Sequence, residues 1–163
     1  MSEHNWSEFN KRISINTNKE TIFDFLSIQD NIEKWFLSQA DFYQKNGEKR
    51  SRDEKVEPGD TYKWMWHGSD DVAEGKIFEV QHSNQIKFSF LDCKVRIEIG
   101  EEDGETMVEL TQSDIPLDED SIHNLYVGCS RGWTFYLTNL KSILEGGIDL
   151  RNRNINLVDV INT

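Results

Sequence analysis

The sequence predicts an α+β fold in which a curved antiparallel sheet wraps around one long C-terminal helix. Three observations predict it: apolar residues alternate from residue 60 to residue 112, the links between these runs are short, and one long amphipathic stretch follows. Short links favour antiparallel pairing, because parallel neighbours need a long crossover. One face of such a sheet is apolar and must be covered, and the terminal helix is the only predicted element long enough to cover it.

The chain before the alternating region predicts one strand and two short helices. Residues 8–15 alternate between apolar and polar side chains, as in a half-buried strand. Thr17 and Glu20 then form a capping-box pattern, with Thr17 as the expected N-cap of the first helix. A second short helix carries Trp35 on its apolar side. Residues 44–60 are polar and of mixed charge, which predicts a solvated loop or an edge strand.

Several further strands follow, each with its apolar side chains at every second position. The segments between them, HGSDD, QHSN, LDC and GEEDG, are rich in turn-forming residues and favour tight connections. The strands therefore form a meander. Two of these strands are residues 72–80 and residues 105–112. In the others, the side chains that share one face are Tyr62, Trp64 and Trp66; Ile86, Phe88 and Phe90; and Val95, Ile97 and Ile99.

The long helix is predicted from residue 119 to residue 145. The acidic run 118–120 would complement the positive end of its dipole, and Gly146-Gly147 is typical of a helix C-terminus. At 1.5 Å per residue, a helix of about 25 residues is roughly 38 Å long. Its apolar residues recur at helical spacing along one stripe: Ile122, Tyr126, Cys129, Trp133, Tyr136, Leu140 and Leu144.

The charge balance limits the classes of partner. The 30 acidic residues outnumber the 18 basic ones, for a net charge of −12, so we expect neither nucleic-acid binding nor attraction to an anionic membrane surface. The polar N-terminus lacks the apolar region of a signal peptide, and no apolar run is long enough for a membrane span. Cys93 and Cys129 are then expected to be reduced and to pack as small apolar residues. We expect a cytoplasmic protein.

Four segments carry a resemblance to a known family. They are residues 9–15 with 20–25, residues 32–36, residues 58–64, and Gly132-Trp133 with Leu137, Leu140, Lys141 and Leu144. In this order they resemble the START-like (SRPBCC) superfamily, which has the helix-grip fold, and within it the family related to the activator of the heat-shock-protein-90 ATPase. We therefore expect one domain over residues 1–147. Residues 148–163 form a tail, expected to be a short strand, disordered, or packed against the domain or a partner.

One sequence motif resembles a hydrolase active site and another resembles a calcium-binding loop, but the surrounding residues argue against both functions. Gly128-Cys129-Ser130-Arg131-Gly132 matches the G-x-S-x-G pattern of hydrolases, but the helical stripe runs through it and every histidine precedes Ser130. We instead expect its two glycines to let the helix approach the sheet closely. The aspartates at 114, 118 and 120 lack the glycine and the distal glutamate of a calcium loop, and the histidines lack ligand spacing. We expect no metal, no cofactor and no assigned catalytic residue.

The aromatic residues are the candidate ligand-binding set. They either fill an ordinary core or line a pocket between sheet and helix, where Tyr62 and Tyr136 would supply polar groups. The set comprises Trp35, Tyr62, Trp64, Trp66, Phe78, Phe88, Phe90, Trp133 and Tyr136.

The resemblance implies small-molecule or lipid binders, cyclases or co-chaperones, and three functions follow. The first is binding of a hydrophobic or amphipathic small molecule, lipid-like or aromatic, in a cavity between the sheet and the C-terminal helix. The alternative is a protein-interaction or co-chaperone-like module with a filled core and a protein partner. The third is a cyclase-like or hydrolase-like enzyme, which needs a titratable group in the cavity. Its candidates are Glu79, Arg96, Glu109 and His123.

Overall fold

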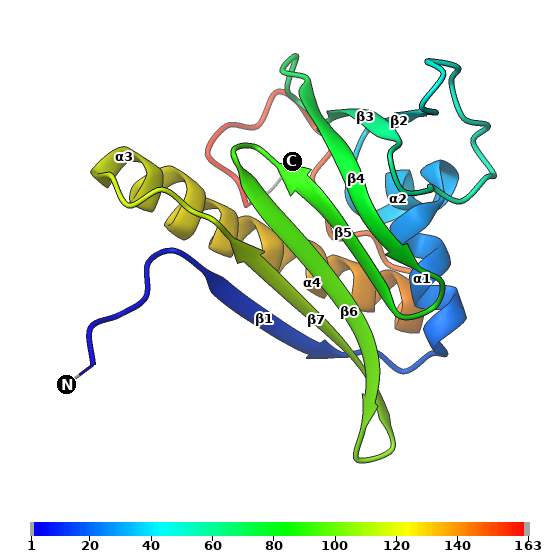
Figure 1. The fold of residues 1–163 in the computed structure, drawn as a ribbon, viewed down its shortest axis with the longest axis horizontal. Coiled ribbons are helices and arrows are strands. Elements are labelled where there is room, and N and C mark those ends of the chain that lie inside the picture. The colour runs from blue at the N-terminus through cyan, green and yellow to red at the C-terminus, as the bar shows by residue number, and fades with distance from the viewer. Residues whose placement is uncertain (1, 162–163) are drawn as a thin grey trace.

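A computed structural model describes residues 2–161 of the chain (Figure 1). Its elements, in chain order, are β1 (Phe9–Ser14), α1 (Lys19–Ser27), α2 (Gln29–Trp35), β2 (Gln39–Tyr43), β3 (Thr61–Met65), β4 (Ala73–Gln81), β5 (Gln85–Phe90), β6 (Cys93–Glu102), β7 (Glu105–Ser113), α3 (Glu119–Ser121), η1 (Ile122–Gly128) and α4 (Cys129–Gly146).

The strands form one seven-stranded sheet in the order β1-β7-β6-β5-β4-β3-β2. Every pairing is antiparallel, and β1 joins the meander by pairing with β7, with Phe9 opposite Gln112. The sheet is curved and unclosed, and α4 lies across one of its faces, with α1 and α2 at one end (Figure 1). This arrangement confirms the predicted α+β, helix-grip fold.

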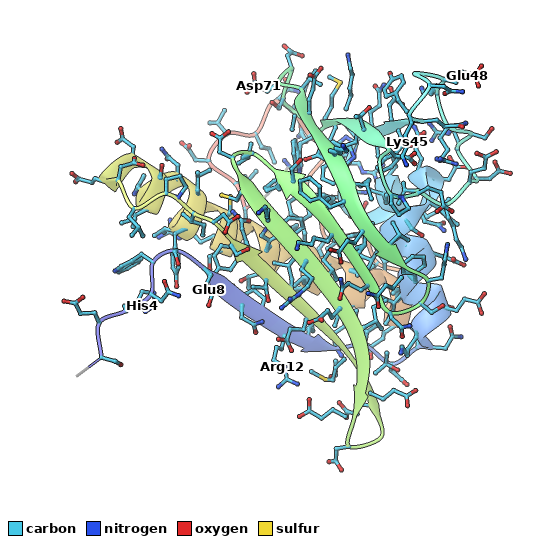
Figure 2. All side chains as sticks on the ribbon, in the orientation of Figure 1. His4, Glu8, Arg12, Lys45, Glu48 and Asp71 are labelled. Carbon is cyan, nitrogen blue, oxygen red and sulfur yellow. The ribbon has the colours of Figure 1, made fainter. Side chains whose placement is uncertain are left out.

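Alternation along the strands explains why the helix packs where it does. On β5 and β6 every second side chain is buried, and on β7 Val108 and Leu110 are completely buried. Trp133, Leu137 and Leu140 of α4 are also buried. Charged side chains lie on the outside of the molecule; those of Glu8, Arg12, Glu48 and Asp71 extend outward from the ribbon (Figure 2). The apolar faces of the strands and of the helix therefore share one core.

The strand β2 was not predicted, and it forms an edge of the sheet beside β3. Ala40 and Phe42 are buried, but Asp41 lies between them and its side chain is mostly buried too. Its carboxylate accepts hydrogen bonds from Gln29 and Gln39 and pairs with Lys49 at 2.8 Å. These partners compensate the charge of Asp41, so residues 39–43 can form an edge strand although a charged residue interrupts their apolar pattern.

The expected loop over residues 44–60 is more tightly held than a solvated loop. Val56 is completely buried, and Arg50 makes a two-pronged ion pair with the buried Asp60, at 2.6 and 2.9 Å. Arg52 pairs with Asp30 of α2 at 2.7 Å. The basic residues of this segment therefore tie it to the domain.

The first helix begins one residue later than predicted. Asn18 is the N-cap, because its Oδ1 accepts a hydrogen bond from the backbone N–H of Thr21 at 2.8 Å. Thr17 lies before the cap. Both residue types are good N-caps, so the sequence alone left the choice open by one position.

The long C-terminal helix begins and ends where predicted but is not one regular helix. Asp118 caps its start, accepting a hydrogen bond from the N–H of Ser121 at 2.9 Å, and Gly147 ends it with a left-handed φ of 71°. Between them, η1 has π-helical hydrogen bonding and no buried residue. The apolar stripe is therefore buried from Trp133 to Leu140, whereas its first residues lie on the wider π turn and Leu144 is half-buried.

The chain beyond α4 returns to the domain. The buried Arg151 donates to the carbonyls of Glu33 at 3.0 Å and Leu37 at 3.1 Å, and it pairs with Asp149 at 2.9 Å. The buried Asn139 of α4 accepts the N–H of Leu150 at 2.7 Å. We call residues 149–151 the C-terminal anchor. Beyond it, exposed apolar side chains follow: Ile155, Leu157, Val158, Val160 and Ile161.

We predict that Arg151→Leu lowers the free energy of unfolding by about 3–5 kcal/mol, because it removes the buried donor that serves the carbonyls of Glu33 and Leu37 and the closest buried ion-pair partner of Asp149. Arg153→Leu is the matched control, since Arg153 also bonds Asp149 but is largely exposed, and should cost less than about 1 kcal/mol. Urea denaturation measures both. Equal losses would contradict the anchor.

The pH dependence provides a second readout of the same contact. Burial alone would raise the pKa of Asp149, but hydrogen bonds from Arg151 and Arg153 outweigh it and hold the pKa well below its usual range. The stabilisation is therefore complete above pH about 4 and is lost as the pH falls toward the lowered pKa. Wild type should lose more stability over this acid range than Arg151→Leu does.

Candidate functional site

The structure gathers most of the predicted aromatic set into one cluster. Trp64 stacks on Tyr62 with ring centroids 3.8 Å apart and meets Phe88 at 5.4 Å. Phe90 lies 5.3 Å from Trp133 and 6.2 Å from Trp66. Except for the half-buried Trp66, the members of this cluster are buried: Trp35, Tyr62, Trp64, Phe88, Phe90, Trp133 and Tyr136.

Phe78 does not join the cluster. Its side chain is 39% exposed on β4, whereas its neighbour Ile77 is buried. The β4–β5 pairing shifts register between Ile77 and Glu79, as at a β-bulge. Because alternation decides which face a residue takes, Phe78 points away from the core here.

Phe36 is the residue that the predicted set missed. Its ring lies between 4.9 and 5.7 Å from those of Trp35, Trp64, Trp66, Trp133 and Tyr136. It caps the C-terminus of α2, so it projects from the end of a short helix into the space between the sheet and α4. The sequence did place Phe36 directly after Trp35, which was the available signal. Helical periodicity does not show, however, that the residue at the end of α2 becomes the centre of the aromatic cluster.

The interior between sheet and helix is almost filled. A void of about 20 Å³ remains there, lined by Leu26, Ile32, Trp35, Phe36, Trp64, Phe88, Ile97 and Trp133. Ligand pockets for drug-sized molecules usually measure about 300–1,000 Å³. We call this space the inner void. It has no room for a lipid chain.

A larger apolar pocket lies where α4 begins, and we call it the mouth pocket. Its volume is about 180 Å³, and it is lined by Phe36, Trp66, Phe90, Leu91, Asn124, Gly128, Cys129, Gly132, Trp133 and Tyr136. Phe36, Phe90, Trp133 and Tyr136 are buried, whereas Leu91, Asn124 and Gly128 are exposed. The pocket thus has an aromatic floor and an exposed rim.

The two glycines of the G-x-S-x-G motif form part of this pocket. Apart from the adjacent residues and the neighbouring backbone of its own helix, a Cβ atom at Gly132 would meet no atom within 4 Å, and one at Gly128 would meet only the His123 carbonyl at 3.7 Å. The expectation that they allow close approach to the sheet was therefore wrong. Their missing side chains leave space, and Gly128 ends the π-helical η1, a kind of segment that is often found at functional sites.

Hydrogen bonds fix two of the buried indole rings. Trp133 Nε1 donates to Gln112 Oε1 at 2.9 Å, and Trp35 Nε1 donates to the carbonyl of Phe25 at 2.7 Å. Trp64 Nε1 is buried and has no hydrogen-bond partner among the described residues. Its ring is surrounded instead by aromatic rings.

The two predicted polar tyrosines differ in position. The Tyr62 hydroxyl donates to the carbonyl of Ser89, burial raises its pKa, and Tyr62 lines neither the inner void nor the mouth pocket. Tyr136 does line the mouth pocket, and burial raises its pKa to about 12. Its hydroxyl is therefore protonated at neutral pH.

The structure does not bring the candidate catalytic groups to the apolar cavities. The linings of the inner void and the mouth pocket include no carboxylate or histidine among the described residues, so Glu79, Arg96, Glu109 and His123 lie elsewhere. Ser130 lies inside α4, not at a strand-to-helix turn. Within residues 2–161, no group of three or more His, Cys, Asp or Glu is placed to hold a metal ion. No helix in that part of the chain is long and apolar enough to span a membrane.

A curved, unclosed antiparallel sheet around a long C-terminal helix, with two short helices after the first strand, is the helix-grip fold of the START-like class. Residues 16–145 match the family described as "Activator of Hsp90 ATPase homolog 1-like protein". The chain belongs to this family, as its resemblance predicted. No curated protein sequence matches the chain.

Solved structures show the same fold. A protein from Staphylococcus saprophyticus is 22% identical with a TM-score of 0.70, covering 88% of this chain and 96% of its own. The Aha1 dimer from Colwellia psychrerythraea is 18% identical with a TM-score of 0.68, covering 86% and 97%. DynU16, from the dynemicin biosynthetic locus, is 14% identical with a TM-score of 0.67, covering 90% of this chain and 50% of its own. At these identities the likeness concerns the fold.

We predict that Cys129 reacts with iodoacetamide more slowly than a free thiol at pH 8, yet faster than Cys93. Burial raises the pKa of both thiols, which lowers the fraction of reactive thiolate, but Cys129 is only half buried and Cys93 is buried. Mass spectrometry of labelled peptides measures the two rates. Labelling of Cys129 at the rate of a free thiol, or of Cys93 first, would contradict this description of the pocket wall.

Proposed function

We propose that this protein binds a small apolar or aromatic group in the mouth pocket. The observation that carries the proposal is the contrast between the two spaces: the interior is filled, whereas the pocket at the start of α4 has an aromatic floor and an exposed rim. Ligand sites are typically concave and mostly apolar with a few polar groups, here Tyr136, Asn124 and Cys129.

The volume of the pocket limits the ligand. An engineered apolar cavity of about 150 Å³ in another protein binds benzene. The mouth pocket, at about 180 Å³, is therefore suited to a single ring or a short branched chain. This favours a compact aromatic or aliphatic group over the long acyl chain of a lipid.

Gly132→Leu tests the site, and toluene, phenol and acetophenone serve as probes. A leucine side chain would occupy the pocket, so we expect each probe that binds wild type to lose at least tenfold in affinity. The fold should be retained, because the site is open and replacing a helical glycine favours the helix by up to about 1 kcal/mol. Chemical-shift titration measures binding, and thermal unfolding checks the fold.

Gly146→Leu is the matched control for this experiment. Gly146 also lies in α4 with open space around its Cα, but it does not line the mouth pocket. This variant should bind the probes as wild type does. Unchanged binding by Gly132→Leu, or no binding of any probe to wild type, would exclude the mouth pocket as the site.

A second candidate function, a protein-interaction module, is supported by the tail. Ile155, Val158 and Ile161 are 74%, 79% and 79% exposed, and contiguous exposed apolar residues often mark interaction sites. The similar Colwellia structure is a dimer, so a second copy of the chain is the partner we propose.

A truncation after residue 151 tests this second candidate, because it keeps the C-terminal anchor. We expect the full chain to self-associate at micromolar concentrations and the truncated chain to remain monomeric. Sedimentation velocity over a concentration series measures both. A monomeric full chain, or equal association of the two chains, would eliminate the tail as the contact.

A further inference from the structure

We propose that the mouth pocket and the inner void together form one site for a compact uncharged molecule that carries a hydrogen-bond acceptor, and that Trp64 Nε1 donates to this acceptor. The inference rests on the proposed function, because the ligand enters through the mouth pocket. It adds a chemical class, such as an aryl ketone, and a residue that selects it.

The unpaired indole is the first observation. Trp64 is 4% exposed, and its Nε1 has no acceptor among the described residues. Its ring is stacked on Tyr62 and meets Phe36 at 5.6 Å and Phe88 at 5.4 Å, edge to face. An N–H group over an aromatic ring is only weakly satisfied, whereas buried donors are nearly always hydrogen-bonded.

The other buried indoles show that this fold can provide acceptors. Trp35 and Trp133, which line the same void, donate to a carbonyl and to Gln112 at ordinary distances. Trp64 is thus the exception among neighbouring rings of one type. Trp64 lines the inner void while its Nε1 is itself fully buried, so an acceptor reaches this unpaired donor only when the surrounding rings shift.

A water molecule would satisfy this donor poorly. The inner void, at about 20 Å³, has room for roughly one water. A buried water usually makes two to four hydrogen bonds, but the other side chains around the void are apolar or, like Trp35 and Trp133, already paired. An acceptor atom that is covalently part of an apolar ligand needs only the one bond.

Two rings separate the inner void from the mouth pocket. Phe36 and Trp133 line both spaces, and their centroids are 5.1 Å apart. Trp133 is tied to Gln112, whereas a phenylalanine ring has no polar tie. The proposal therefore requires the Phe36 side chain to rotate so that the two spaces join.

The surroundings also determine the charge of the ligand. Among the described residues, the side chains around the inner void include one unpaired donor, Trp64 Nε1, and no cation, so a carboxylate placed there would lose its hydration for a single hydrogen bond. A carbonyl or ether oxygen loses much less. We therefore expect selection for a neutral acceptor at the inner end of the ligand, with its ring in the mouth pocket.

The test compares acetophenone with α-methylstyrene, in which a CH₂ group replaces the carbonyl oxygen at nearly the same shape. We expect wild type to bind acetophenone about five- to tenfold more tightly, and acetophenone alone to move the indole N–H resonance of Trp64 downfield. Chemical-shift titration of ¹⁵N-labelled protein measures both effects. The spectrum of Trp64→Phe assigns the resonance.

Trp64→Phe should bind the two probes with equal affinity, because it removes the donor and keeps an aromatic ring. If this variant does not fold, triple-resonance spectra of ¹³C,¹⁵N-labelled wild type assign the Trp64 indole resonance instead, and its response to the two probes still decides. Equal binding of both probes by wild type with an unmoved Trp64 resonance would overturn the inference but leave the mouth pocket as a site. Failure of both probes to bind would overturn both.

Discussion

The packing of aromatic rings between the sheet and α4 is the constraint on which the rest of this structure depends. These rings join the apolar face of the strands to that of the helix, and they leave an inner void of only about 20 Å³. Because interiors are packed about as densely as organic crystals, such a core tolerates little extra volume. The same rings that hold the fold together therefore leave the larger of the two apolar spaces, of about 180 Å³, at the start of α4.

The backbone beside Phe36 is held from the far end of the chain. The carbonyl of Trp35 accepts from Asn139 at 2.8 Å, and that of Leu37 accepts from Arg151 at 3.1 Å. The residues on either side of Phe36 are thus fixed to α4 and to the C-terminal anchor, while its ring packs against five other aromatic rings. In the proposed site, this ring would rotate while the backbone around it stays in place.

Periodicity explains which parts of the architecture could be predicted. The strands from β3 to β7 and the extent of the C-terminal helix follow from alternation and from helical spacing, which burial on one face imposes directly on the sequence. The strand β2 was not predicted because its buried Asp41 interrupts the apolar pattern. Side chains from α2 and from the loop after β2 compensate this charge, and their proximity is not visible in the sequence. The π-helical hydrogen bonding of η1 was not predicted because the apolar residues of this segment still recur at α-helical spacing. Phe78 was misplaced because a bulge reverses alternation without any sign in the sequence.

The candidate site was predictable in its residue types but not in its geometry. The sequence indicated an aromatic set around Trp64 and Trp133, yet whether those rings enclose a cavity depends on volumes that only the packed structure fixes. Gly128 and Gly132 illustrate the difference. The same G-x-S-x-G sequence could belong to a hydrolase, to a helix packed closely on a sheet or to the wall of an open pocket. The space around a Cβ placed at each glycine distinguishes the last two cases. At Gly132 that space is empty, so the glycine is not required by the packing of α4, and the binding proposal gives a physical reason for leaving the position unfilled.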